Sequence, residues 1–273
     1  MVLLHGENMT IRPEPRRGPA GRGTSSQAEL RPRRAIILAA GQGLRLLPHT
    51  RQTPKCLLDL GGRTVLQNQL EVLRSAGIEE AVVVVGYHAE AVRRSVTGPA
   101  RFVENPDYAS TNSIYSLWLA RRFLDRPCLV MNGDVVFGSD VLQKLLDCPL
   151  PDVVVYDSQS GQDPEETKVR LAWHGRLVNI GKSIPASASQ GEYLGLLRLS
   201  QGGARQLAQV LERMVGHGRV VSDWVPAAVR RMLHTRPVFA ADVAGRPWIE
   251  IDFREDLERA RNEVYPRLCG TTA

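Results

Sequence analysis

Short apolar runs alternate with helical segments from Arg34 onward. The predicted strands are Ala35–Ala40, Ala81–Val85, Arg101–Val103 and Pro127–Met131. Apolar residues recur at helical spacing in Thr64–Ser75, Ala89–Val96 and Ser113–Phe123. Strands that are apolar at successive positions are typical of a parallel sheet buried on both faces. The alternation therefore predicts an α/β fold with a mostly parallel, doubly wound, Rossmann-like sheet.

The pattern changes between about residues 151 and 200. The strands predicted there are Val153–Tyr156, Lys168–Trp173, Leu177–Ile180 and Tyr193–Leu199. Short polar or glycine-containing turns separate them, which favours antiparallel pairing. Further helices are predicted at Gly203–Met214, Val225–Leu233 and Arg254–Val264, and further strands at Val238–Asp242 and Trp248–Asp252. We predict one domain over residues 34–265, with residues 151–200 as an inserted antiparallel β-rich lobe.

Charge is unevenly distributed along the 273 residues, of which 43% are apolar and 23% charged. Most of the formal charge of +6 lies in the first 34 residues, where seven arginines oppose three glutamates. We predict a disordered basic leader over residues 1–33, with a tail that binds an anionic partner as the alternative. Residues 266–273 form a predicted C-terminal tail. No basic stripe or RNA motif accompanies the rest, so nucleic-acid binding is not expected.

Hydropathy and cysteine usage indicate a cytoplasmic protein. No apolar run approaches the ~18 residues that a membrane span needs, so membrane insertion is not expected. The four cysteines are far apart, which argues against a disulfide framework or a zinc site and favours a reducing compartment.

A glycine-containing turn follows the first predicted strand. Gly41-Gln42-Gly43 would bring backbone N–H groups close to an anion, and Arg45 and Lys55 would neutralise a polyphosphate. The alternative is a tight turn with two surface cations. The dinucleotide fingerprint is excluded because Leu46 stands at its third glycine, and the chain contains no Gly-Lys-Ser/Thr of a Walker loop.

Carboxylates follow two other predicted strands. Asp134 comes after Cys128–Met131, and Asp252 ends the strand Trp248–Asp252. Ligands bind outside the carboxyl ends of strands in open α/β sheets, so this pair predicts a Mg²⁺ site for phosphoryl chemistry. The alternatives are an Asx turn at Asp134 and a helix N-cap at Asp252.

Together these motifs resemble the signature of the nucleotidyltransferase superfamily, which includes sugar-phosphate nucleotidyltransferases. Residues 39–45 and 53–57 match the pattern LAAGxGxRL followed by PKxL, and Gly133-Asp134 and Glu250-Ile251-Asp252 follow in the order of that family. Residues 105–108 and 111–117 further resemble the bacterial phosphocholine cytidylyltransferases, although Ser113 replaces the usual second asparagine. The resemblance covers about residues 34–265.

This resemblance implies a Mg²⁺-dependent cytidylyltransferase that transfers CMP from CTP to a small phosphorylated or phosphonate compound. The implied nucleotide-binding residues are Leu38, Ala39, Ala40, Gly41, Gln42, Gly43, Arg45, Lys55, Gly86, Tyr87, Asn112, Ser113 and Gly133. The implied acceptor-binding residues are Tyr115, Lys182, Glu192, Tyr193 and Trp224, and residues 151–200 would bind the acceptor. Asp134 and Asp252 would hold Mg²⁺.

Both reactants of such a transfer are anions. Arg45, Lys55 and Lys182 are therefore the expected catalytic residues, because they would neutralise the repulsion between the reactants. The acceptor is already ionised at neutral pH, so no general base is expected. The acceptor itself stays open among phosphocholine, 2-aminoethylphosphonate and 2-hydroxyethylphosphonate.

Two other functions stay open on sequence alone. One is a sugar-1-phosphate or inositol-phosphate nucleotidyltransferase that uses another NTP. The other is a non-catalytic, nucleotide-binding regulatory protein, against which the joint presence of Arg45, Lys55, Asp134 and Asp252 argues. A homodimer is compatible with the sequence.

Overall fold

The structure, a computed structural model, describes residues 31–160, 163–216 and 221–270. The predicted leader therefore lies outside the described residues up to position 30, as does the end of the predicted tail at positions 271–273.

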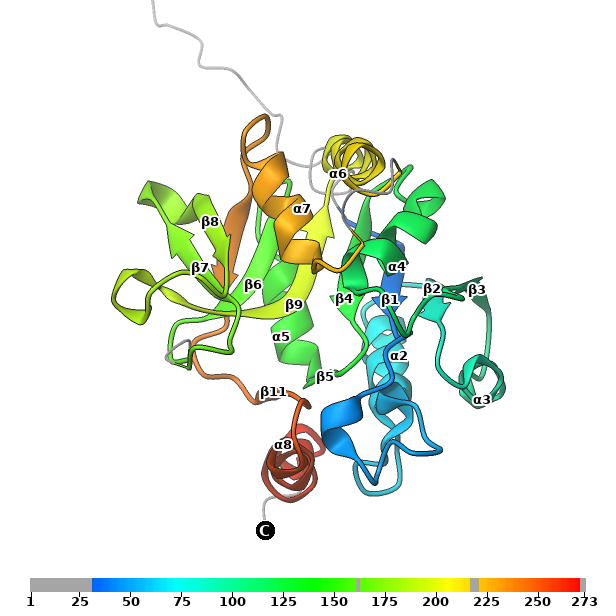
Figure 1. Cartoon of the computed structure of the whole chain (residues 1–273). Coiled ribbons are helices and arrows are strands. Elements are labelled where there is room, and N and C mark those ends of the chain that lie inside the picture. Colours follow the sequence, from blue (N-terminus) through cyan, green and yellow to red (C-terminus); the bar gives the residue numbers. More distant parts are fainter. Residues whose placement is uncertain (1–30, 161–162, 217–220, 271–273) are drawn as a thin grey trace, which may run out of the picture.

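A mixed central sheet organises the fold, in the strand order β10-β6-β9-β4-β1-β2-β3 (Figure 1). Its parallel half consists of β1 (Arg34–Leu38), β2 (Glu80–Val85), β3 (Ala100–Glu104) and β4 (Cys128–Asn132). The remaining strands are β6 (Val153–Asp157), β9 (Gly191–Leu199) and β10 (Phe239–Asp242). β9 runs antiparallel to both β4 and β6. The predicted α/β class with a mostly parallel sheet and additional antiparallel strands is confirmed.

The predicted β-rich lobe is largely part of this sheet. All nine residues of β9 are buried, because helices cover both of its faces as they do for the parallel strands. Only β7 (Lys168–Leu171) and β8 (Leu177–Gly181) stand apart, as an antiparallel hairpin that joins the start of β9 through β7. The antiparallel pairing predicted for this region is confirmed, and β6 and β9 make it through the central sheet itself.

Helices cover the two faces of the sheet. One face packs against α4 (Ser113–Leu119), α6 (Gln201–Met214) and α7 (Val225–Met232), and the other packs against α2 (Val65–Ser75) and α5 (Ser139–Leu146). Neighbouring strand residues alternate between the faces. Ile36 therefore belongs to the first core and Ile37 to the second. The remaining helices are α3 (Ala89–Ser95), α8 (Arg254–Arg259) and α9 (Tyr265–Leu268), the last two being joined through a π-helical turn at Ala260–Val264.

A separate two-stranded sheet brings the chain's end to the pocket described below. β5 (Val135–Phe137) pairs antiparallel with β11 (Trp248–Glu250), so Glu250 lies opposite Val135. The Ile251 N–H then donates to the Asp134 carbonyl over 3.1 Å. This pairing places Asp134 beside Asp252, which is 118 positions further along the chain. In the part of the chain that the structure describes, no helix has the length and apolar character needed to cross a bilayer.

Candidate active site

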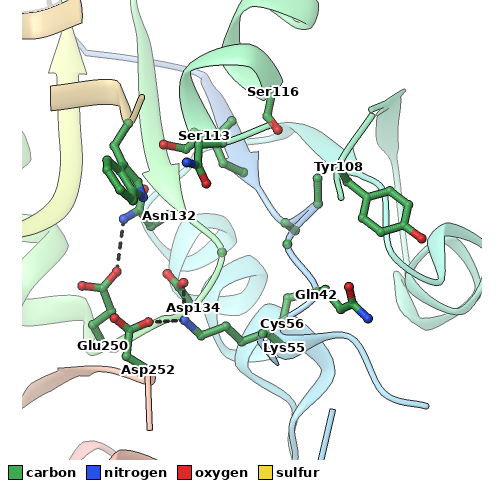
Figure 2. Close-up of a pocket in the computed structure, with 18 of the residues that line it drawn as sticks. Gln42, Lys55, Cys56, Tyr108, Ser113, Ser116, Asn132, Asp134, Glu250 and Asp252 are labelled. Carbon is green, nitrogen blue, oxygen red and sulfur yellow. Dashed lines mark hydrogen bonds and ion pairs between the residues drawn. The ribbon is translucent and has the colours of Figure 1, made fainter. Parts of the chain in front are cut away.

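A pocket of about 440 Å³ opens at the carboxyl ends of β1 and β4 (Figure 2). Most of the residues that the sequence predicted for the site line it. These are Leu38, Ala39, Ala40, Gly41, Gln42, Gly43, Arg45, Lys55, Asn112, Ser113, Gly133, Asp134, Lys182, Tyr193, Trp224 and Asp252. The topology therefore brings together residues from both ends of the domain, as the position of the motifs after strands predicted.

Two glycines shape the floor of the pocket. Gly43 has a positive φ of 68°, and its carbonyl accepts a hydrogen bond of 2.7 Å from the Thr50 hydroxyl, which fixes the turn after β1. At Gly133 a Cβ atom would lie 2.7 Å from the Leu38 carbonyl oxygen, so any side chain there would force the ends of β1 and β4 apart. Both positions require glycine, which accounts for two glycines of the sequence motifs.

Lys55 links two carboxylates at one end of the pocket. Its Nζ lies 2.7 Å from Asp134 Oδ2 and 2.5 Å from Asp252 Oδ1 (Figure 2). Arg45 approaches the second oxygen of Asp252 at 3.5 Å. Burial alone would lower the pKa of Lys55, but Asp134, Asp252 and Glu250 outweigh burial and raise it. Lys55 is therefore a fixed positive charge at neutral pH.

Glu250 is a third carboxylate at this end, and the sequence analysis did not assign it a role. Carboxylate oxygens of Asp134, Glu250 and Asp252 lie within 4.8 Å of one another. Burial, with the nearby charge of Asp134, raises the pKa of Glu250 to about 8, and the Asn132 amide donates to it over 3.3 Å. Residues two apart in an extended segment point to the same side, so the spacing of Glu250 and Asp252 could have revealed it.

The three carboxylates fit the Mg²⁺ that the sequence analysis expected. Asp134 Oδ1 is buried and accepts no hydrogen bond from the described residues. A buried carboxylate oxygen without a donor is costly unless a cation satisfies it. Clustered carboxylate oxygens are also the ligands that Mg²⁺ prefers. The expectation of Mg²⁺ stays a prediction with a chemically suitable ligand set.

Cys56 lies beneath Lys55 and is buried. Burial raises the pKa of its thiol to about 12, which keeps it protonated and unreactive at neutral pH. Cys56 is therefore a packing residue beside Lys55.

An uncharged region forms the opposite end of the pocket, where Tyr108, Ser113 and Ser116 are seen in Figure 2. The buried Asn105 side chain organises it by donating to Thr111 Oγ1 over 3.1 Å and to Ser116 Oγ over 3.0 Å. This polar but uncharged end suits a nucleoside, whereas the Lys55 end suits phosphate groups. Asn105, Tyr108 and Ser116 lie in the segments that carry the family resemblance, but they were not predicted as site residues.

A third part of the pocket lies around Lys182, just after β8. Lys182 Nζ is 3.3 Å from Glu165 Oε2 and 5.5 Å from the centre of the Trp224 ring. Trp224 is half exposed, and the buried Tyr193 lines the same pocket. A cation therefore already lies between an aromatic face and a carboxylate in this region.

Two predicted nucleotide-binding residues lie outside the pocket lining. A Cβ atom at Gly86 would lie 2.8 Å from both the Ala40 carbonyl oxygen and the Tyr108 Cβ, so Gly86 permits close packing behind the pocket wall. The Tyr87 hydroxyl donates to the Arg51 carbonyl over 2.6 Å, and its ring packs against Tyr108. The structure assigns both residues to support of the pocket wall.

Two predicted acceptor-binding residues also lie elsewhere. The Tyr115 hydroxyl donates to Asp107 over 2.9 Å, and its ring packs against the ring of Trp118, which also belongs to α4. Glu192 is buried in β9, where it accepts a hydrogen bond from Ser160. Burial, with the charge of the neighbouring Glu166, raises the pKa of Glu192 to about 8. Neither side chain reaches the pocket.

Comparisons with known proteins agree with this geometry. Residues 35–223 match the model of the MobA-like NTP transferase domain. The chain is 42% identical over 253 residues to the CMP-5'-(3-aminopropyl)phosphonate synthase of Streptomyces rubellomurinus, covering 86% of this chain and 39% of that protein. It is 26% identical over 250 residues to the CTP:phosphoglutamine cytidylyltransferase of Campylobacter jejuni, covering 82% of this chain and 97% of that protein. The chain thus spans well under half of the first relative and almost all of the second.

Solved structures show the same fold. The CTP:phosphocholine cytidylyltransferase of Streptococcus pneumoniae superposes with a TM-score of 0.68 at 23% identity, over 84% of this chain and 97% of that one. The inositol-1-phosphate CTP transferase of T. maritima superposes with a TM-score of 0.70 at 22% identity, over 85% of this chain and 98% of that one.

Proposed function

Because the chain belongs to the family of MobA-like NTP transferase domains, we propose that it transfers CMP from CTP to a small phosphonate or phosphate that carries a primary amine. The match to this family confirms that the chain is a nucleotidyltransferase, as the sequence resemblance implied. The observation that carries the proposal is the position of Lys55 between Asp134 and Asp252, at the charged end of a pocket whose other end is polar and uncharged. The relatives described above support CTP as the nucleotide, since one is named for a CMP-linked phosphonate product and the other is a CTP-dependent cytidylyltransferase by name.

The reaction that fits this pocket is an in-line displacement. A phosphonate or phosphate oxygen of the acceptor forms a bond to the α-phosphorus of CTP, and the bond from that phosphorus to the bridging oxygen of pyrophosphate breaks. Arg45 and Lys55 neutralise the triphosphate, and Lys182 neutralises the incoming acceptor. Asp134, Glu250 and Asp252 would hold Mg²⁺, which supplies further neutralisation of the phosphate oxygens when it is bound.

The surroundings of Lys182 support an amine in the acceptor. The Lys182 ammonium already contacts Glu165 and the Trp224 ring, so this region can hold a second ammonium group once the Lys182 charge pairs with the acceptor's phosphonate. A quaternary ammonium is recognised by a cage of several aromatic faces. Among the described residues near Lys182, Trp224 offers an exposed aromatic face and Glu165 a hydrogen-bonding carboxylate, a pair that favours a primary amine over choline.

The experiment is a pyrophosphate-release assay of the purified full chain with Mg²⁺, each NTP in turn and a panel of acceptors. The panel contains 2-aminoethylphosphonate, 2-hydroxyethylphosphonate, phosphoethanolamine, phosphocholine, inositol-1-phosphate and glucose-1-phosphate. We expect release with CTP and an amine-bearing acceptor. Release only with a sugar phosphate and another NTP would establish a sugar nucleotidyltransferase instead, and CTP binding without release would indicate a regulatory protein.

A matched pair of variants tests the amine site. Glu165→Gln is expected to lower kcat/KM for 2-aminoethylphosphonate about tenfold relative to 2-hydroxyethylphosphonate, because one charged hydrogen bond is lost. Glu255→Gln changes an exposed glutamate of α8 and serves as the control. An unchanged preference in Glu165→Gln would remove Glu165 from the acceptor site.

A further inference from the structure

The start of α4 and the start of α7 are joined by hydrogen bonds, although the two segments are more than 100 positions apart. The bonds run from Asn112 N to Val221 O (2.9 Å), from Ile114 N to Asp223 O (3.2 Å), from Val225 N to Ser113 Oγ (3.1 Å) and from the Asn112 side-chain amide to Ser222 O. Residues 112–114 therefore hold residues 221–225 at successive positions, and we call this set of bonds the α4–α7 clasp.

The clasp connects the nucleoside end of the pocket to the proposed acceptor region. Asn112 and Ser113 line the uncharged end of the pocket, which suits the nucleoside. Trp224 lines the region around Lys182. Its two chain neighbours, Asp223 and Val225, each form one of the hydrogen bonds of the clasp. The backbone position of Trp224 is therefore set by the start of α4.

The α4 side of the clasp is itself held firmly. Trp118 Nε1 of α4 donates to Glu212 of α6 over 3.1 Å, and Arg121, just after α4, pairs with the same carboxylate at 2.7 Å. The Arg121 guanidinium also stacks on the Trp118 ring at 4.3 Å from its centre. Because these contacts tie α4 to α6, the segment 221–225 is the part that the clasp positions.

We infer that Asn112 is a positioning residue for the acceptor site, acting through Trp224. Its side-chain amide donates to the Ser222 carbonyl, two positions before that ring. The resemblance had implied a role for Asn112 in binding the nucleotide. The new assignment rests on the proposed function in placing the acceptor beside Trp224, and it makes the nucleoside end and the acceptor end parts of one rigid unit.

The test separates nucleotide binding from acceptor use. In Asn112→Ala we expect CTP binding, measured by calorimetry without acceptor, to weaken less than acceptor kcat/KM falls, because the Asn112 side-chain amide is already bonded to the Ser222 carbonyl. We expect kcat/KM for the acceptor at saturating CTP to fall about tenfold, which corresponds to the loss of one hydrogen bond. A tenfold weaker CTP affinity with an unchanged acceptor KM would overturn the inference and return Asn112 to the nucleotide site.

A double-mutant cycle with Trp224→Ala checks the route of the effect. If Asn112 acts through Trp224, then Asn112→Ala changes acceptor kcat/KM less than twofold when Trp224 is already absent. Additive losses would show that Asn112 acts by another route. Thr235→Ala is the control, because this residue lies after α7 and outside the pocket, and it should leave both CTP binding and acceptor kcat/KM unchanged.

Hydrogen exchange gives a readout that does not need catalysis. The Val225 amide should exchange at least tenfold faster in Asn112→Ala than in the parent protein, since the clasp that protects it is weakened. Unchanged exchange would refute the clasp as a positioning device whether or not the protein is active. Absence of any reaction in the parent protein, with altered exchange in the variant, would refute the proposed function and leave the clasp intact.

Discussion

Replacement of Lys55 by methionine tests the charged end of the pocket. Methionine keeps an unbranched side chain of similar length and removes the ammonium. Lys55 is the shared partner of Asp134 and Asp252, and its side chain is 13% exposed. The change leaves the carboxylates of Asp134, Glu250 and Asp252 within 4.8 Å of one another without the ammonium between them.

Two magnitudes follow from these contacts. A positioned charge that faces the reacting phosphates contributes about 2.7–4 kcal/mol to the barrier, so kcat should fall about 10²- to 10³-fold. Breaking a fully buried ion pair costs about 3–5 kcal/mol of folding stability. The Asp134 and Asp252 side chains are 23% and 38% exposed, and solvent screening reduces the expected loss of stability to about 1–3 kcal/mol.

The stability loss should depend on pH in a defined direction. Without Lys55, Glu250 and Asp252 lose a positive charge that lowers their pKa values, so the pKa values of both carboxyl groups in the folded protein rise. Groups whose pKa is raised by folding bind extra protons in the folded state, and their contribution to stability is lost as the pH rises. Lys55→Met should therefore be more destabilising at pH 8 than at pH 5.5, with a smaller difference between the two pH values in the parent protein.

The assay combines initial rates of pyrophosphate release with urea unfolding at both pH values. Lys144→Met is the matched control, because Lys144 is an exposed lysine on α5 away from the pocket. A Lys55→Met enzyme whose kcat lies within tenfold of that of Lys144→Met would refute the assignment of Lys55 to the reacting phosphates.

Three further predictions concern individual carboxylates and one tyrosine. Asp134→Asn should weaken Mn²⁺ binding, measured by electron paramagnetic resonance, and lower kcat at least 100-fold; undiminished Mn²⁺ binding would contradict the metal site. Glu192 has a pKa raised to about 8 by burial, so the parent protein should lose stability as pH rises from about 4.5 to about 8, by at most roughly 1.4 kcal/mol per pH unit. Urea unfolding should show a flatter profile in Glu192→Gln, and an equal slope would argue against a protonated Glu192. Tyr115→Phe should leave kcat/KM within twofold, since its hydroxyl bonds Asp107 outside the pocket; a tenfold loss would return Tyr115 to the acceptor site.

The parallel strands could be predicted from the sequence because burial on both faces leaves a continuous apolar run. The predicted Ala81–Val85 and the observed β2, Glu80–Val85, differ by one residue. The short β5 and α5 were missed, since Val135–Phe137 and Ser139–Leu146 offer too few positions for a clear period. The antiparallel insertion of β9 into the main sheet depends on long-range pairing that local patterns do not encode.

Periodicity also explains two errors in the predicted site. Tyr115 follows Ser113 by two positions on a helix and points almost to the opposite side, whereas Ser116, three positions on, shares the pocket face. Glu192 and Tyr193 are neighbours on β9, so they face opposite sides of the sheet, and only Tyr193 lines the pocket. The direction of each side chain was thus available from the sequence once the element was known. The Asn112–Ser222 contact could not be predicted from the sequence, because it joins segments that only the tertiary fold brings together.

The chain leaves the central sheet after Asp157 in β6 and re-enters it at Gly191 in β9, and Asp157 is paired directly with Glu192. The excursion between these points begins and ends at neighbouring positions, and within it β7 returns to pair with the start of β9, where Lys168 lies opposite Glu192 and Val169 opposite Gly191. Glu165, Thr167 and Lys182 all belong to it and line the pocket. The described residues of this excursion thus supply one side of the proposed acceptor region, and Tyr193 of β9 with Trp224 at the start of α7 supplies the other, so an engineered exchange of acceptor preference has to change these segments together.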